Sequence, residues 1–180
     1  MVEEVELKFV DPLIFDASVI FNIGHRGELS QVIARLAERY RLLVPPEVVE
    51  ETQRISEFRQ YYHNLISADF EQHAGKVPAM YSDAIIKLAT RLGSGELNVI
   101  ILALDTGGTA VIDERTARKE ARTLNIPVTG TLGLLQYAMQ QAWLTEQEAL
   151  VKIETLRANG FRIPSFAHGQ MLSEYLSNLG

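Results

Sequence analysis

Short apolar runs alternate along the chain with longer segments whose apolar residues recur at helical spacing. The runs at 10–15, 41–44 and 126–128 are too short for helices and stop at a turn or a polar residue, so each predicts a buried strand. Between them, segments such as 27–40 place their apolar side chains on one helical face. This alternation predicts an α/β fold, in which a central parallel sheet of about four to five short strands carries helices on both faces.

The remaining helices are predicted from the same spacing and from their breaks. A pair of prolines at 45–46 ends one strand and suits the first turn of the next helix. The other expected helices are 17–23, 81–92, 114–124, 130–139, 145–157 and 165–178. Helix 81–92 is expected to bury Ile85, Ile86, Leu88 and Ala89. Residues 55–80 are the least legible part, with a helical stripe that gives way to Gly75 and Pro78.

The most apolar segment, 96–105, fits either a strand or a helix. Its β-branched residues favour a strand. The run is helix-sized, however, and a plausible strand at 110–112 follows the Gly107-Gly108 break. We therefore predict a buried helix over 96–105.

The chain length and composition indicate one ordinary globular domain. The 180 residues suit a single domain, with a core over about 10–142 and a helical extension at 145–180. Cysteine is absent, which excludes disulfides, zinc-thiolate sites and cysteine nucleophiles. The first residues are acidic, unlike a signal peptide, and no apolar run approaches the about 20 residues of a membrane span, so we expect a cytoplasmic protein. A net charge of −6 means that nucleic acid would need local basic residues and a bound cation.

Four carboxylates stand at the ends and starts of predicted elements. Asp16 and Asp113 each follow an apolar strand, and Glu51 and Glu96 are expected in the first turns of helices that start at the same edge of the sheet. Sites in open parallel sheets form beyond the carboxyl ends of the strands, so these acids should converge. Clustered carboxylates need protons or a cation at neutral pH. Oxygen ligands favour Mg²⁺ or Mn²⁺, which can activate water against a phosphodiester.

Each acid also has a purely structural interpretation. Asp16 and Asp113 could cap the helices that follow them. Glu96 could be a first-turn acid that the helix dipole favours, and Glu51 could be a solvated acid beside Glu50. The repeated pattern of an apolar strand that ends in Asp raises the odds of a functional site above those of any single acid.

Other chemistries fit the sequence less well. Walker and dinucleotide glycine patterns are absent, as is a Gly-x-Ser-x-Gly elbow. An aspartyl phosphatase would need a second acid where Ser18 stands. The histidines share no ligand spacing and are expected at the surface; they are His25, His63, His73 and His168.

Five short motifs, taken in order, resemble those of PIN-domain proteins. They are Leu-Ile-Phe-Asp-Ala-Ser at 13–18, Val-Pro-Pro-Glu-Val-Val-Glu-Glu at 44–51, Gly-Glu at 95–96, Val-Ile-Asp-Glu-Arg at 111–115 and Thr-Gly-Thr-Leu-Gly-Leu-Leu at 129–135. The last is similar to the ending of a VapC-like prokaryotic subgroup of mostly uncharacterised members. The resemblance covers about residues 10–142.

The resemblance implies a PIN-like three-layer sandwich and an endoribonuclease that depends on Mg²⁺ or Mn²⁺. Many such proteins are toxins held by a cognate antitoxin, and many form homodimers. By position, the catalytic set is Asp16, Glu51, Glu96 and Asp113; of these, Asp16, Glu96 and Asp113 correspond to the metal ligands. Ser18 corresponds to the small polar residue beside the first acid and is a candidate substrate-binding residue. Glu rather than Asp stands at 96, and Asn98 occupies a place where the subgroup often has an acid.

The helix after Asp113 carries the basic residues closest to these acids. Arg115 and Arg118 are candidates for contacts with RNA phosphates. The alternative is a solvated helix face that pairs with Glu114 and Glu120, which is the better interpretation for Arg122. Two functions therefore stay open: a PIN-type ribonuclease, or a catalytically silent PIN-like module that binds a protein or RNA partner.

Overall fold

A five-stranded parallel sheet forms the centre of the molecule. The computed structural model describes residues 7–26 and 28–162. The strands follow the order β3-β2-β1-β4-β5, and every neighbouring pair is parallel. Their bounds are β1 Leu13–Phe15, β2 Leu42–Val44, β3 Glu71–Gln72, β4 Thr109–Val111 and β5 Val128–Thr129. The predicted α/β class is thus confirmed, with the limits of the predicted strands shifted by up to three residues.

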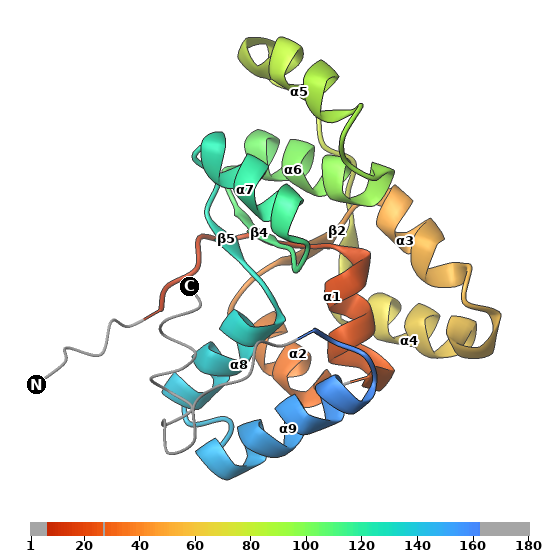
Figure 1. Ribbon diagram of the computed structural model, residues 1–180, viewed down its shortest axis with the longest axis vertical. Helices are drawn as coiled ribbons and strands as arrows, with labels where there is room; N and C mark the ends of the chain where they lie inside the picture. The colour runs from red at the N-terminus through yellow and green to blue at the C-terminus, as the bar shows by residue number, and fades with distance from the viewer. Residues whose placement is uncertain (1–6, 27, 163–180) are drawn as a thin grey trace, which may run out of the picture.

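Helices cover both faces of this sheet. Among the described residues the α-helices are α1 Ala17–Phe21, α2 Ser30–Ala37, α3 Pro46–Gln53, α4 Arg59–Asp69, α5 Ser82–Leu88, α6 Ser94–Thr106, α7 Arg115–Thr123, α8 Thr131–Gln140 and α9 Glu146–Ala158. Three short helices of other types are the π-helix η1 Asn22–Arg26 and the 3-10 helices η2 Ser56–Phe58 and η3 Ala79–Tyr81. In Figure 1, α6 and α7 lie above the strands and α1, α2 and α8 lie below them. Helix α5 stands away from the body at the top, and α9 lies beyond α8 at the bottom (Figure 1).

The three inner strands consist entirely of buried residues. All three positions of β1, β2 and β4 are buried, since helices cover them on both faces. This is why their sequences read as continuous apolar runs and not as alternating patterns. The first strand sits in the middle of the sheet, and Phe15 at its end meets Phe70 edge to face at 5.1 Å. The core therefore holds the end of β1, where Asp16 follows, in a fixed position.

The ambiguous apolar segment is a helix, as predicted. Helix α6 buries Val99, Ile100 and Leu102 completely. It ends at Gly107, whose φ of 74° lies in the left-handed region that glycine adopts without strain. Strand β4 begins two residues later.

The middle of the chain contains one strand that was not predicted and one helix whose predicted buried face is partly wrong. Strand β3 was not predicted, because Glu71 and Gln72 are polar and exposed and pair with β2 through the backbone alone. In α5 only Ile85 and Leu88 are buried, whereas Ile86 is 66% exposed and Ala89 is exposed. The helix stands away from the body, so it lacks a second surface to cover that stripe (Figure 1).

Some expectations fall outside the described residues, namely the helix at 165–178 and His168. Of the other histidines, His63 and His73 are exposed as expected. Within 7–26 and 28–162, none of the helices combines the length and apolar character that crossing a membrane requires.

Candidate active site

The order of the strands creates a switch point between β1 and β4. From β1 the chain builds β2 and β3 on one side, then crosses to build β4 and β5 on the other. In open parallel sheets a crevice forms beyond the carboxyl ends of the strands at such a point. Asp16 directly follows β1, and Asp113 comes two residues after β4. The Asp16 N–H donates to the Val111 carbonyl at 3.0 Å, which holds the two strand ends together.

Asp16 is buried and caps the helix that follows it. Its residue is 4% exposed, and Oδ2 accepts hydrogen bonds from the Ser18 N–H at 3.2 Å and the Ser18 hydroxyl at 2.5 Å. Burial raises the pKa of Asp16; the bonds from Ser18 lower it in part, and the charge of Asp113 raises it further. The capping interpretation is therefore correct, but it does not explain the neighbouring charges.

A glycine in the first turn of α6 leaves the space in which two acids meet. A Cβ on Gly95 would stand 3.0 Å from Glu51 Oε2 and 3.5 Å from Asp16 Oδ1. Burial raises the pKa of Glu51, and the charge of Asp16 raises it further. Glu51 lies in the second turn of α3 and not in the first turn as expected, and its residue is exposed. Even so, its carboxylate reaches Asp16, so the structure brings these two predicted site residues together.

Glu96 faces the same acids, but one of its oxygens is used by its own helix. Its Oε2 accepts from the Gly93 N–H at 3.0 Å, which closes the first turn of α6. Burial raises the pKa of Glu96; the Gly93 bond lowers it in part, and the charges of Asp16, Glu114 and Glu51 raise it. The structural interpretation of Glu96 is thus confirmed, because its side chain closes the first turn of α6. The same side chain adds charge next to Asp16 and Glu51, and its role as a metal ligand stays a prediction.

Asp113 is held by three hydrogen bonds from two directions. Thr131 donates its N–H to Oδ1 at 2.8 Å and its hydroxyl to Oδ2 at 2.5 Å. The Asn22 amide donates to Oδ2 at 2.8 Å. A Cβ on Gly130 would stand 2.6 Å from Asp113 Oδ1, so a glycine is needed where the chain passes this close. These bonds fix the direction of the carboxylate.

Asn22 and Thr131 were not among the predicted site residues. Thr131 lies inside the Thr-Gly-Thr motif at 129–131 that carries part of the family resemblance, and it opens α8, so its position was a usable signal. Asn22 is a polar residue in an apolar helical run, one helical turn after Ser18. Its contact with Asp113 spans 91 positions of sequence and could not be predicted from spacing.

The basic residues of α7 differ in how close they come to the acids. Arg118 is half-buried, donates from Nη1 to the Ile112 carbonyl at 3.2 Å and reaches the same space beside Gly130 as Asp113. Burial and the charge of Arg122 lower the pKa of Arg118, whereas Asp113 raises it. Arg115 is exposed at the first position of the helix. Arg118 therefore lies beside Asp113, whereas Arg115 is exposed at the start of α7.

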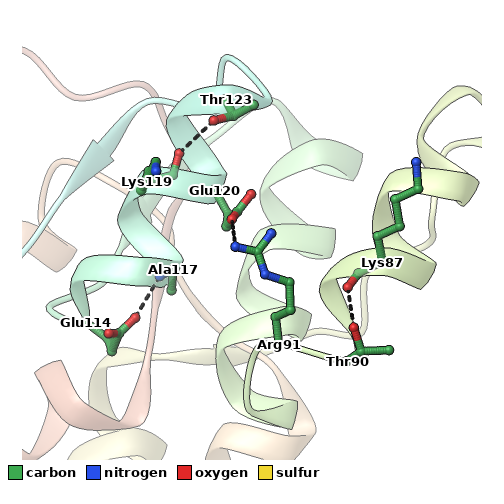
Figure 2. A network of polar contacts seen from close by, with 8 residues as sticks. All are labelled: Lys87, Thr90, Arg91, Glu114, Ala117, Lys119, Glu120 and Thr123. Atoms are coloured by element: carbon green, nitrogen blue, oxygen red, sulfur yellow. Dashed lines mark hydrogen bonds and ion pairs between the residues drawn. The ribbon is translucent and has the colours of Figure 1, made fainter.

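Glu114, the N-cap of α7, and Glu120, inside α7, were expected to pair with the arginines of this helix, but each has another partner. Glu114 accepts from the Ala117 N–H at 2.7 Å and caps the helix. Glu120 pairs with Arg91 at 2.9 Å, which ties the segment before α6 to α7 (Figure 2). Glu114 and Glu120 therefore do not pair with the arginines of α7, as the alternative interpretation expected.

The residues suit a hard cation by chemistry, although they are not gathered into a closed ligand set. In the described part of the chain, no three His, Asp or Glu side chains stand together as ligands for one ion. Oxygen atoms nevertheless dominate the site, and the pKa values of Asp16, Glu51 and Glu96 are all raised, first by burial and then by the charge of at least one neighbouring acid. A divalent ion would relieve that repulsion, and the gap at Gly95 lies between two of the acids. The site thus fits Mg²⁺ or Mn²⁺ in donor type.

These features define an α/β protein with an acidic site at the switch point of a parallel sheet. A family model described as PIN domain matches residues 12–176, and the chain therefore belongs to the PIN-domain family. The family expected from the sequence motifs is confirmed, whereas the VapC-like subgroup stays a prediction. No curated protein matches the chain. Among solved structures, PAE2754 from Pyrobaculum aerophilum is similar, with a TM-score of 0.49 and 12% identity over 71% of this chain and 97% of that one.

Proposed function

We propose that the protein is a PIN-type endoribonuclease that depends on Mg²⁺ or Mn²⁺. The observation that supports this most is the meeting of Asp16 and Glu51 at Gly95, beside the fixed carboxylate of Asp113. Raised pKa values of neighbouring acids at the switch point of a sheet favour a functional site. Family membership adds a fold of nuclease type.

The chain's own residues divide the work by position. Asp16, Glu96 and Asp113, the metal ligands predicted from the sequence, would hold the ion, and Glu51 would complete the acidic set beside Asp16 at Gly95. When bound, the ion would activate a water molecule and offset negative charge on the phosphodiester. Ser18 keeps Asp16 oriented through Oδ2. The protein side chains would thus hold and orient the ion, and the ion would supply the activation of water.

Binding of RNA falls to the basic residues next to the acids. Arg118 is half-buried beside Asp113, so its guanidinium can meet a phosphate that approaches the ion. Arg115, exposed at the start of α7, would extend the contact along the strand. The overall charge of −6 gives no other attraction, so binding should depend on these local cations and on the bound ion.

The test is RNA cleavage with Mg²⁺ or Mn²⁺ by the wild type, Asp16→Asn and Asp113→Asn. Both variants remove a charge and keep a hydrogen-bond acceptor, so folding should survive while cleavage falls to background. Asp83→Asn is the matched control, because Asp83 lies in the first turn of the outlying helix α5. This variant should cleave RNA as the wild type does. Equal cleavage by the wild type and both site variants would refute the proposal that these acids form a nuclease site.

A catalytically silent PIN-like module is the second candidate. It is favoured by Glu96, whose Oε2 is folded back onto Gly93, and by Asn98, whose amide donates to the Ser94 carbonyl at 2.9 Å within its own helix. Calorimetry with Mn²⁺ separates the two candidates. No binding heat at millimolar Mn²⁺ would favour the silent module, and binding that Asp16→Asn abolishes would favour the nuclease.

The proposal extends to a toxin of a toxin–antitoxin pair that acts in the cytoplasm as a homodimer. Its support is the VapC-like motif at 129–135. Induced expression of the chain should then arrest growth, and Asp16→Asn should not. Sedimentation of the purified chain as a monomer would remove the homodimer from the proposal.

A further inference from the structure

A buried asparagine links the first and fourth acids of the site. Asn22 directly follows α1, the helix that Asp16 caps at its start, and is 2% exposed. Its Nδ2 donates to Asp113 Oδ2 at 2.8 Å. One short helix therefore has Asp16 at one end and, at the other, a side chain that touches Asp113.

The other polar atom of the Asn22 amide has no hydrogen-bond partner among the residues that the structure describes. Its Oδ1 is buried and accepts no hydrogen bond from any residue in 7–26 or 28–162. Turning the amide over would place Oδ1 against a carboxylate oxygen, and two acceptors repel each other, so Nδ2 must be the atom that faces Asp113. The unsatisfied Oδ1 is the consequence of that contact.

Stability alone does not account for an asparagine at this position. Leucine has nearly the same branched shape and would fill the space without burying a carbonyl that lacks a partner. The neighbours Phe21 and Ile23 are apolar, and Ile23 is completely buried. The feature that leucine cannot reproduce is the donor to Asp113.

We propose that Asn22 is a positioning residue of the acidic site. Thr131, at the start of α8, and Asn22, at the end of α1, both donate hydrogen bonds to the Asp113 carboxylate. Since α1 also carries Asp16 at its N-cap, Asn22 sets where Asp113 stands relative to Asp16. This inference rests on the proposed function only in taking Asp113 to be a residue of the site, and it assigns Asn22 no contact with RNA.

The test compares Asn22→Leu with the wild type in three measurements. We expect its thermal midpoint to be equal to or above that of the wild type, because the unsatisfied acceptor is gone. We expect Mn²⁺ affinity by calorimetry to fall by about 10- to 100-fold, the usual effect of losing a partner that orients a ligand. In RNA cleavage at saturating Mn²⁺, kcat should fall while KM stays the same. Asn64→Leu, at an exposed position of α4, is the matched control and should behave as the wild type.

A double-mutant cycle on unfolding tests the contact itself, without metal or RNA. Asn22→Leu, Asp113→Asn and the double variant should be non-additive, because the two side chains are in direct contact.

The outcomes separate this inference from the proposed function. Additive unfolding energies, a markedly destabilised Asn22→Leu, or wild-type Mn²⁺ affinity in that variant would each overturn the positioning role. A wild type that binds Mn²⁺ but cleaves no RNA would overturn the nuclease, whereas reduced Mn²⁺ affinity in Asn22→Leu would still support the role of Asn22. A wild type that binds no Mn²⁺ would overturn both.

Discussion

The gap at Gly95 offers the sharpest test of where an ion would sit. Gly95→Ala adds a Cβ 3.0 Å from Glu51 Oε2, 3.4 Å from Val48 Cγ2 and 3.5 Å from Asp16 Oδ1. The first distance is too short, but the Glu51 side chain is exposed and can move its tip away. Alanine in a helix is more stable than glycine by about 0.5–1 kcal/mol, which offsets that adjustment. The variant should therefore fold with a free energy of unfolding within about 1 kcal/mol of the wild type.

Ion binding should change far more than stability does, because the new methyl group occupies the place where two acids converge. At 100 times the wild-type Kd, Mn²⁺ would stabilise the wild type by about 2.7 kcal/mol. If the variant binds about 100-fold more weakly, the same concentration would stabilise it by only about 0.4 kcal/mol. Thermal unfolding with and without Mn²⁺ measures this difference.

The control for this experiment is Ser94→Ala. Ser94 is exposed one residue earlier in the same turn, so this change raises helix propensity without entering the gap. An unchanged Mn²⁺ response in Gly95→Ala would show that the ion does not use the gap. A loss of more than about 2 kcal/mol in the absence of Mn²⁺ would show that the glycine serves packing.

Three further predictions follow from the same geometry. Burial raises the pKa of Asp16, so the folded state binds its proton more tightly than the unfolded state; stability contributed by the protonated form is lost as pH rises through the raised pKa. Asp16→Asn, which still caps the helix, should be more stable than the wild type at neutral pH and lose this advantage below about pH 4. Urea unfolding across this pH range measures the difference, and a more stable wild type at neutral pH would contradict the prediction. Gly130→Ala, with its Cβ 2.6 Å from Asp113 Oδ1, should lose about 1–3 kcal/mol in denaturant unfolding, and an unchanged midpoint would refute the close contact. Arg118→Gln should weaken RNA binding and reduce the slope of log K against log salt concentration by about one, whereas Arg122→Gln should do neither. Equal effects of the two changes in a salt titration would show that Arg118 does not contact RNA at the site.

The parts of the fold that depend on apolar burial could be predicted from the sequence. The helix α6 and the strands that end at Asp16 and near Asp113 leave continuous apolar signals, because both faces of the sheet are covered. Strand β3 could not be predicted, since its two polar residues join the sheet through backbone bonds that any sequence can make.

The site was predictable only as far as it follows from strand ends. Parallel strands bring Asp16 and Asp113 to one edge whatever their order in the sheet. The contact between Asn22 and Asp113 depends on β4 lying beside β1, which is a property of the strand order and leaves no trace in local spacing. In the same way, Glu51 reaches Asp16 from the second turn of its helix because Gly95 leaves room, and that room depends on how α3 and α6 pack.

The charges of the site also determine how metal and RNA would depend on each other. Without an ion, Asp16, Glu51 and Glu96 repel one another and would repel a phosphodiester in the same way. An ion that relieves this repulsion therefore raises the affinity for RNA, and because the coupling is reciprocal, RNA must raise the affinity for the ion by the same factor. Arg118 can attract a phosphate before the ion arrives, but its charge lies on the Asp113 side and leaves the Asp16 and Glu51 side uncompensated. A nuclease at this site should thus bind Mn²⁺ more tightly in the presence of an uncleavable RNA than alone, and a silent module that binds RNA elsewhere should show no such coupling.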